Sequence, residues 1–144
     1  MKPVVVDASV VVKWFVNDVL TEQAVATLDR FDFHAPSLIV AEQSNALCKY
    51  ARRGDLSAAD CGAAVNRLPR LVRLTPMVEL ASEAAALAVE LDHPAYDCFY
   101  LSLARRLGHD LLTADKRLLA CIAGDNRWRS VYLGDIPINP EPSP

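Results

Sequence analysis

Four acidic residues lie in stretches of this 144-residue sequence that are otherwise largely apolar. Asp7 follows the run Val-Val-Val, and Asp115 comes two residues after Leu-Leu-Thr113. Asp97 and Glu42 lie in segments that supply mainly aliphatic and aromatic side chains. A carboxylate in such company is costly to bury unless a positive charge pairs with it. The four residues are therefore candidates for a site that holds a positively charged partner.

Four carboxylates at one place would repel one another and raise one another's pKa, and a divalent cation is the usual remedy. Oxygen ligands select Mg²⁺ or Mn²⁺ rather than zinc. Mg²⁺ keeps part of its water shell and takes few carboxylates, so substrate phosphate fills other positions. Such a site activates a water for attack on phosphorus and neutralises the leaving oxygen. These residues indicate metal-dependent phosphoryl or phosphodiester chemistry.

Each acid taken alone also has a structural interpretation, which the sequence leaves open. Three of them lie near the start of predicted helices, where a carboxylate is stabilising by about 0.3–1 kcal/mol. Glu42 could pair with Lys49 or Arg53, or face solvent. The joint case is stronger, because Asp7 and Asp115 both follow strands of what we expect to be one sheet.

The elements that would position these acids alternate between strands and helices. Strands are predicted at residues 3–7, 33–35, 71–74, 110–113 and 130–133. Helices are predicted at residues 8–15, 21–30, 37–53, 57–69, 75–91 and 95–107, with a further helix opening at Asp115. This alternation predicts βαβ units and a parallel sheet covered by helices on both faces. Ligands bind beyond the carboxyl ends of such strands, which is where Asp7 and Asp115 fall.

Helix boundaries follow from residues that favour caps and breaks. Ser37, Ser57 and Thr75 are expected to cap the helices that follow them. Gly54 and Gly108 suit the left-handed conformation just past a helix end. A proline at position 69 should end the helix that begins at Ser57.

Composition and missing motifs exclude several other functions. The length is that of one domain, and 52% hydrophobic residues suffice for a core. The sequence contains no G-x-G-x-x-G, Walker, H-E-x-x-H or G-x-S-x-G motif, which argues against nucleotide cofactors and serine or thiol hydrolysis. The four widely spaced cysteines fit buried thiols of a cytoplasmic protein. His34, His93 and His109 lie in unrelated contexts and are expected to be satisfied or exposed.

Neither end of the chain suggests a membrane anchor. The apolar run at residues 3–12 is interrupted by Asp7 and is too short to span a membrane. We place the folded domain at residues 1–136 and treat residues 137–144, which contain four prolines, as an extended terminal arm.

The segments around the four acids resemble a known family. Val-Val-Val-Asp7-Ala-Ser9, Val-Ala-Glu42-Gln-Ser-Asn45, Tyr96-Asp97-Cys-Phe-Tyr and Leu-Thr113-Ala-Asp115 follow one another as in PIN-domain ribonucleases. The likeness is greatest to VapC-type toxins of toxin–antitoxin pairs, and it spans about residues 3 to 134. One such motif is weak by itself, whereas four in the family's order and spacing are a specific signal.

The resemblance implies a fold, a chemistry and partners. The fold is a three-layer α/β/α sandwich with a central parallel sheet, and the activity is RNA cleavage that depends on Mg²⁺ or Mn²⁺. The resemblance places Asp7, Glu42, Asp97 and Asp115 as the metal-binding and catalytic set, with Ser9 and Thr113 as polar residues lining it. It also implies a homodimer and a cognate antitoxin protein that blocks the acidic groove.

The basic residues are the candidates for contact with RNA. Lys116 and Arg117 adjoin Asp115 and are the most suggestive pair. Arg127-Trp128-Arg129 is either a stacking site for single-stranded RNA or a solvated loop with a half-buried tryptophan. The net charge of −3 argues against a nucleic-acid partner at first sight. Removing the four site acids from that sum leaves +1, so we expect RNA binding to depend on the metal.

Two other functions compete with this interpretation. A haloacid dehalogenase phosphatase needs a second aspartate two residues after the first, and Ser9 occupies that position. A non-catalytic PIN-like module that binds only RNA or protein is the stronger alternative, although the intact carboxylates argue against it.

Overall fold

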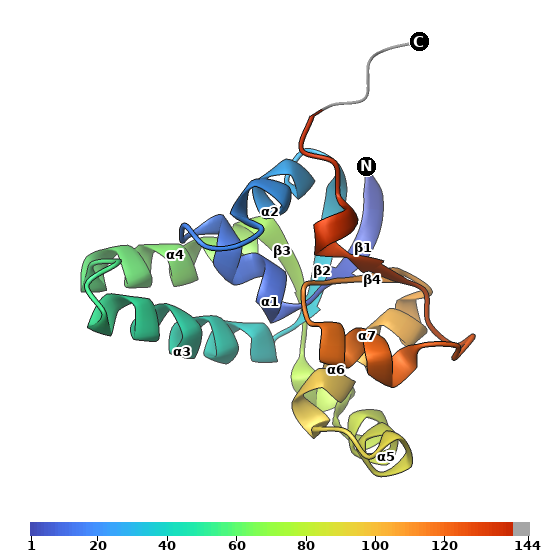
Figure 1. The fold of residues 1–144 in the computed structure, drawn as a ribbon. Helices are drawn as coiled ribbons and strands as arrows, with labels where there is room; N and C mark the ends of the chain where they lie inside the picture. The colour runs from blue at the N-terminus through green and yellow to red at the C-terminus, as the bar shows by residue number, and fades with distance from the viewer. Residues whose placement is uncertain (140–144) are drawn as a thin grey trace.

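Within residues 1–139, which this computed structural model describes, five strands form one sheet in the order β3-β2-β1-β4-β5 (Figure 1). All neighbouring pairs in it are parallel. The strands are β1 (Lys2–Val6), β2 (Phe31–Pro36), β3 (Val72–Thr75), β4 (Asp110–Thr113) and β5 (Ser130–Tyr132). Val4, Val5 and Val6 are fully buried, as a central strand covered on both faces requires.

Helices cover the sheet on both faces, which confirms the three-layer α/β/α architecture (Figure 1). They are α1 (Ala8–Val11), α2 (Thr21–Thr27), α3 (Leu38–Arg52), α4 (Ala58–Leu71), α5 (Ala81–Leu91), α6 (Ala95–Leu107) and α7 (Lys116–Ile122). Helices α3 and α4 pack against each other as an arm beside the sheet, while α6 packs on β1, β2 and β4. Short 3₁₀ helices lie at Val12–Trp14, Met77–Glu79 and Leu133–Asp135.

The order of the strands creates the crevice in which the acids meet. The chain builds β1, β2 and β3 in one direction, then returns to place β4 on the other side of β1. The order in which strands are added therefore reverses between β1 and β4, while the strands stay parallel. In such sheets the carboxyl ends of the two strands at this point border the usual binding crevice. Val6 pairs with Leu112, and the amide of Asp7 donates to the carbonyl of Leu112 at 2.9 Å.

Two of the predicted helices are each divided in the structure. The helix predicted at residues 8–15 ends as an α-helix at Val11 and tightens to 3₁₀, because consecutive valines are poor helix formers. The helix predicted from Thr75 is also wrong in its first turn. Thr75 closes β3, and a 3₁₀ turn precedes α5, separated from it by the fully buried Leu80.

Predicted caps and breaks are confirmed at some positions and wrong at others. Ser57 caps α4 by accepting from the amide of Asp60, and Gly54 and Gly108 have the predicted positive φ. The hydroxyl of Ser37 does not cap α3 but accepts from the amide of Met77, 40 residues away. Pro69 lies in the last turn of α4, where its missing N–H interrupts little, and the helix continues to Leu71.

The basic segment around Trp128 is not a stacking site for RNA. Trp128 is 7% exposed, and its Nε1 donates to the carbonyl of Leu101 at 2.8 Å. The guanidinium of Arg127 is held by Asp125 at 2.8 Å and by Glu90 at 3.1 Å. This tryptophan therefore belongs to the core, in agreement with the structural interpretation of the segment.

Several other expectations concern the chain as a whole. All four cysteines lie in the described part and are free thiols. No helix among the described residues has the length and apolar character needed to cross a membrane. The last five residues of the proline-rich arm, 140–144, lie outside the described residues.

Two glycines offer a matched test of helix α6, which carries part of the acidic group. Gly108 ends α6 with a φ of +67°, so Gly108→Ala should lower the free energy of unfolding by about 1 kcal/mol. Gly62 lies exposed inside α4 with open space around its Cα, so Gly62→Ala should raise it by about 1 kcal/mol. Urea unfolding of both variants measures the two changes. If both substitutions change the free energy of unfolding in the same direction, the different roles assigned to Gly108 and Gly62 are wrong.

Candidate active site

Asp7 lies at the carboxyl end of β1 and is 5% exposed. Ser9 Oγ and Thr113 Oγ1 both donate to its Oδ2, at 2.6 and 2.9 Å. These hydroxyls are themselves fixed by backbone amides, since Ser9 Oγ accepts from Ala114 and Thr113 Oγ1 accepts from Asp115. No donor among the described residues contacts Oδ1 of Asp7. One carboxylate oxygen is therefore held in place, and the other is left for a further partner.

The electrostatic environment of Asp7 opposes its negative charge. Burial raises the pKa of this carboxyl above its ordinary value, and the charges of Asp97 and Asp115 raise it further. The hydrogen bonds from Ser9 and Thr113 act in the opposite direction, but burial outweighs them. A cation in the crevice would offset this electrostatic cost.

Glu42 reaches the same crevice from α3. Tyr100, which is fully buried on α6, donates its hydroxyl to Oε1 of Glu42 at 2.6 Å. Burial raises the pKa of Glu42 to about 7, and the charges of Asp7 and Asp97 contribute to that rise. The predicted alternatives for Glu42, ion pairs with Lys49 or Arg53, are not formed among the described residues.

Asp97 lies in the first turn of α6 and is paired with a histidine. His93 Nε2 is 2.6 Å from Oδ2 of Asp97, and the two side chains are 12% and 25% exposed. His93 therefore has a hydrogen-bond partner, as the sequence analysis expected, but its pairing with one of the four candidate acids was not predicted. The spacing of four residues between His93 and Asp97 was the available signal.

Asp115 caps α7, so the structural interpretation of this aspartate holds. Its Oδ1 accepts from the amides of Arg117 and Leu118, at 2.9 and 3.4 Å. Asp7 and Asp97, by contrast, make no side-chain capping bond. Capping does not remove Asp115 from the site, because its charge raises the pKa of Asp7.

The structure brings the four acids within electrostatic range but not into contact around one point. Among residues 1–139, no three Asp, Glu, His or Cys side chains are grouped closely enough to hold a metal ion. His93, Tyr100 and the start of α7 each hold one oxygen of Asp97, Glu42 or Asp115. Carboxylates that repel one another are expected to remain apart until a cation neutralises them. The donors that remain are carboxylate oxygens, which fit Mg²⁺ or Mn²⁺.

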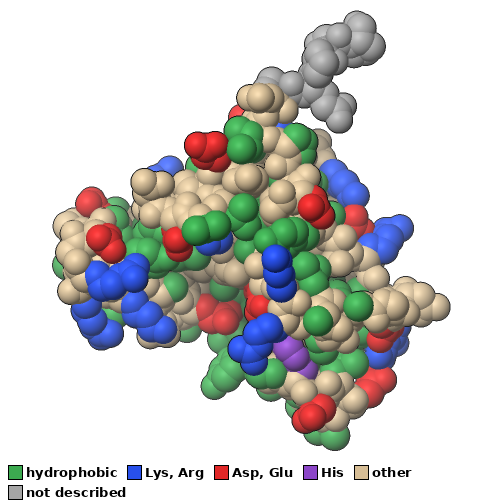
Figure 2. Space-filling model, in the orientation of Figure 1, with side chains coloured by type: hydrophobic (Ala, Val, Ile, Leu, Met, Phe, Trp, Pro, Cys, Tyr) green, Lys and Arg blue, Asp and Glu red, His purple; other side chains and the backbone are tan. Residues whose placement is uncertain are grey.

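The surroundings of the crevice combine acidic and basic side chains. Figure 2 shows acidic side chains in a hollow between the α3–α4 arm and the part formed by α6 and α7, with Lys and Arg side chains along its margin. Lys116 and Arg117, the predicted RNA contacts, are exposed in the first turn of α7. Lys116 Nζ lies 5.5 Å from the ring centroid of Tyr132, and the lysine remains exposed to solvent.

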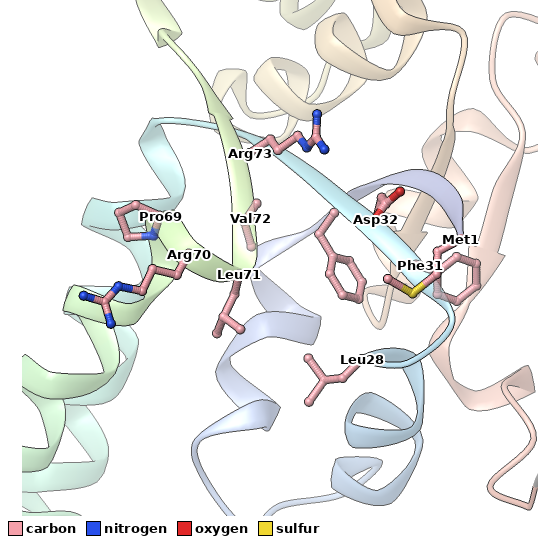
Figure 3. Close-up of a pocket in the computed structure, with 10 residues that line it drawn as sticks. Met1, Leu28, Phe31, Asp32, Pro69, Arg70, Leu71, Val72 and Arg73 are labelled. Carbon is pink, nitrogen blue, oxygen red and sulfur yellow. The ribbon is translucent and has the colours of Figure 1, made fainter.

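A separate hollow lies at the other end of the sheet. It measures about 380 Å³ and is lined at the amino ends of β2 and β3 by Phe31, Phe33 and Val72, with Met1 and Leu28 beside them (Figure 3). Asp7 follows the carboxyl end of β1, so this hollow is not part of the acidic crevice.

Comparison with known proteins identifies the family of the chain. The model of the PIN domain matches residues 4–123. The chain belongs to the PIN-domain family. Ribonuclease VapC3 of Pyrobaculum aerophilum is 31% identical over 79% of this chain and 90% of its own length. VapC ribonuclease Mb0985 of Mycobacterium bovis is 36% identical over 80% of this chain and 87% of its own length. These relatives confirm the resemblance to VapC-type proteins.

A solved structure supports the fold independently of sequence. VapBC2 from Rickettsia felis, bound to a DNA fragment from its promoter, matches with a TM-score of 0.63 at 10% identity. The match covers 90% of this chain and 98% of that chain. The PIN-like α/β/α fold is therefore shared at an identity that sequence comparison alone would not detect.

The raised pKa of Asp7 predicts that neutralising this residue stabilises the metal-free protein. In EDTA, Asp7→Asn should raise the melting temperature by several degrees at pH 7, and the gain should vanish near pH 4. The sign follows because a carboxyl with a raised folded-state pKa stabilises the fold only below its ordinary pKa of 3.8, and loses that contribution as the pH rises. Thermal unfolding over this pH range measures the effect.

Asp110 is the matched control, because it lies at the opposite end of β4. Lys2 donates to this carboxylate at 2.7 Å and lowers its pKa, with Arg129 assisting at 3.0 Å. Asp110→Asn should therefore lower the melting temperature at pH 7. Mn²⁺ should stabilise the wild type and Asp110→Asn but not Asp7→Asn. A lower melting temperature for Asp7→Asn in EDTA would contradict the electrostatic account.

Proposed function

We propose that this chain is a metal-dependent endoribonuclease, the toxin of a type II toxin–antitoxin pair. The observation that carries the proposal is the group formed by Asp7, Glu42, Asp97 and Asp115 at the carboxyl ends of β1 and β4 and on the adjoining helices. The chain has the PIN fold, and relatives that are 31% and 36% identical over 118 and 116 residues are named VapC ribonucleases.

The acids have different parts in this proposal. Asp7, Asp97 and Asp115 would hold Mg²⁺ or Mn²⁺ most directly, with Glu42 acting through water. When bound, the ion would supply activation of water and neutralisation of the leaving oxygen at a phosphodiester. Ser9 and Thr113 fix Oδ2 of Asp7, so that Oδ1 keeps one orientation toward the crevice.

Glu42 is suited to move a proton near neutral pH. In the metal-free chain burial raises the pKa of Glu42 to about 7, close to the pH at which a general base is most effective, and a bound cation would shift it toward the ionised form that accepts a proton. Tyr100 occupies Oε1, so Oε2 is the atom that would accept the proton of the attacking water. His93 holds Oδ2 of Asp97 and thereby orients that carboxylate.

Lys116 and Arg117 would contact the RNA backbone beside Asp115. Both side chains are exposed at the start of α7, within the segment that also supplies Asp115. Phosphate contacts of this kind position a substrate without selecting its sequence. The side chains that select the bases must therefore be sought elsewhere on the crevice.

The proposed activity predicts that the purified chain cuts RNA with Mg²⁺ or Mn²⁺ and stops in EDTA. Asp97→Asn and Asp7→Asn should each lower the cleavage rate by at least about 100-fold, because each removes charge from the reacting centre. Asp110→Asn, at the other end of β4, should retain the wild-type rate. Gel analysis of a labelled RNA measures these rates.

The outcomes separate the proposed function from its alternative. Cleavage by Asp7→Asn and Asp97→Asn at wild-type rates would show that the four acids are not the site. RNA binding by the wild type with no cleavage under any divalent cation would favour a non-catalytic PIN-like module.

The proposal includes a cognate antitoxin and a homodimer. The support for the antitoxin is the structural match to VapBC2 from Rickettsia felis. Expressed alone the chain should arrest growth, and co-expression with the small protein encoded beside it should restore growth and yield a complex that no longer cuts RNA. Sedimentation of the isolated chain should show two copies. A monomer that is harmless to cells and binds no such protein would contradict this part of the proposal.

A further inference from the structure

An exposed tyrosine stands immediately before Asp97. The side chain of Tyr96 is 65% exposed, although the residue lies in the first turn of α6 beside the acidic group. It lines a pocket of about 310 Å³ together with Leu38, Ala41, Glu42 and Asn45. Because Glu42 belongs to both, the pocket opens directly beside the candidate active site.

Helix geometry explains why these side chains meet. Tyr96 and Tyr100 are one turn apart on α6, and Tyr100 contacts Glu42 on α3. Leu38 and Asn45 lie four residues before and three residues after Glu42, so they share its face of α3. The contact between Tyr100 and Glu42 therefore joins α6 and α3. Tyr96 lies one turn before Tyr100 and lines the open pocket beside this contact.

The chemistry of the pocket suits a flat, uncharged group that carries hydrogen-bonding atoms. Leu38 and Ala41 supply apolar surface, and Tyr96 forms no aromatic or cation–π pair with another described residue. Asn45 is exposed, and its side chain has no hydrogen-bond partner among the described residues. A side-chain amide offers two donors and one acceptor, the combination that recognises the edge of a base.

We propose that this pocket is a nucleobase subsite, in which Tyr96 stacks on a base next to the bond that is cut and Asn45 contacts the edge of that base. The identity of the substrate rests on the proposed ribonuclease function. Bases of single-stranded RNA are commonly bound by stacking on aromatic side chains. No Lys or Arg of the described residues lines the pocket, and Glu42 repels anions there, so a base fits it better than a phosphate does.

The test measures binding separately from cleavage. A short single-stranded RNA carries the fluorescent base 2-aminopurine at one position at a time. It is titrated with Asp7→Asn protein, which should not cut it and in which the loss of one acidic charge reduces the repulsion of phosphates that the metal would otherwise relieve. We expect the fluorescence of one position to be quenched by stacking. Adding Tyr96→Ala should remove that quenching and weaken binding by about five- to 150-fold, the loss expected for one base–aromatic stack. Tyr96→Phe should restore both.

Cleavage by otherwise wild-type protein supplies a second measurement. Tyr96→Ala should raise KM more than it lowers kcat, and Asn45→Ala should change which base is preferred beside the cut. Val89→Ala is the matched control, because Val89 is 85% exposed on α5 and does not line the pocket. This control should leave binding, KM and the cleavage pattern unchanged.

The possible results distinguish the subsite from the proposed function. If quenching depends on Tyr96 but the protein with Asp7 intact cuts no RNA, the subsite stands and the proposed ribonuclease function is overturned. Cleavage by Tyr96→Ala with unchanged KM, affinity and sequence pattern would overturn the subsite alone. Loss of antitoxin binding in Tyr96→Ala, with RNA binding intact, would also overturn it and assign this surface to a protein partner.

Discussion

The buried carboxylate of Asp7 is the constraint on which the site depends. Its position is fixed by the sheet, because Asp7 follows the central strand β1 and its backbone N–H donates a hydrogen bond to the carbonyl of Leu112 in β4. Removing a charge from water at such a place is expensive, and neighbouring acids increase that cost. The surrounding hydroxyls of Ser9 and Thr113 limit the cost without neutralising the charge. The fold therefore maintains a buried carboxylate that a cation would stabilise.

The two ends of β4 show that this acidity is local. At the amino end, Asp110 is held between Lys2 and Arg129, and its pKa is lowered. At the carboxyl end, Thr113 and Asp115 face Asp7, and no Lys or Arg of the described residues forms an ion pair with that group. Elsewhere in the described chain, Lys and Arg side chains do form ion pairs with aspartates. The absence of such a pair at the crevice is a property of the site, which a bound cation from solvent would complement.

The elements were largely predictable because their signals are local. Val-Val-Val before Asp7, the glycine at 108 and the cap at Asp115 each act within a few residues, and the alternation of strands and helices then predicts a parallel sheet, although not its strand order. The contacts of Tyr100 with Glu42 and of Ser37 with Met77 span 58 and 40 residues, so no local pattern indicates them. The placement of Trp128 in the core likewise depends on a carbonyl of α6, 27 residues away. The sequence thus predicts four candidate acids, which stay a prediction, whereas the partners that set the pKa values of Asp7 and Glu42 were visible only in the fold.

The distribution of charge is compatible with the proposed RNA substrate, although the protein as a whole is acidic. The net charge of −3 includes the four crevice acids, and the remaining residues carry a small positive excess. In the proposed function, phosphates would be attracted to the margin at Lys116 and Arg117, and they would approach the four acids only when a cation neutralises these. An uncharged base meets no such barrier at the pocket beside Glu42. In the proposed function, backbone and base would be bound by physically different surfaces that meet at Glu42, so a change at Glu42 would affect both.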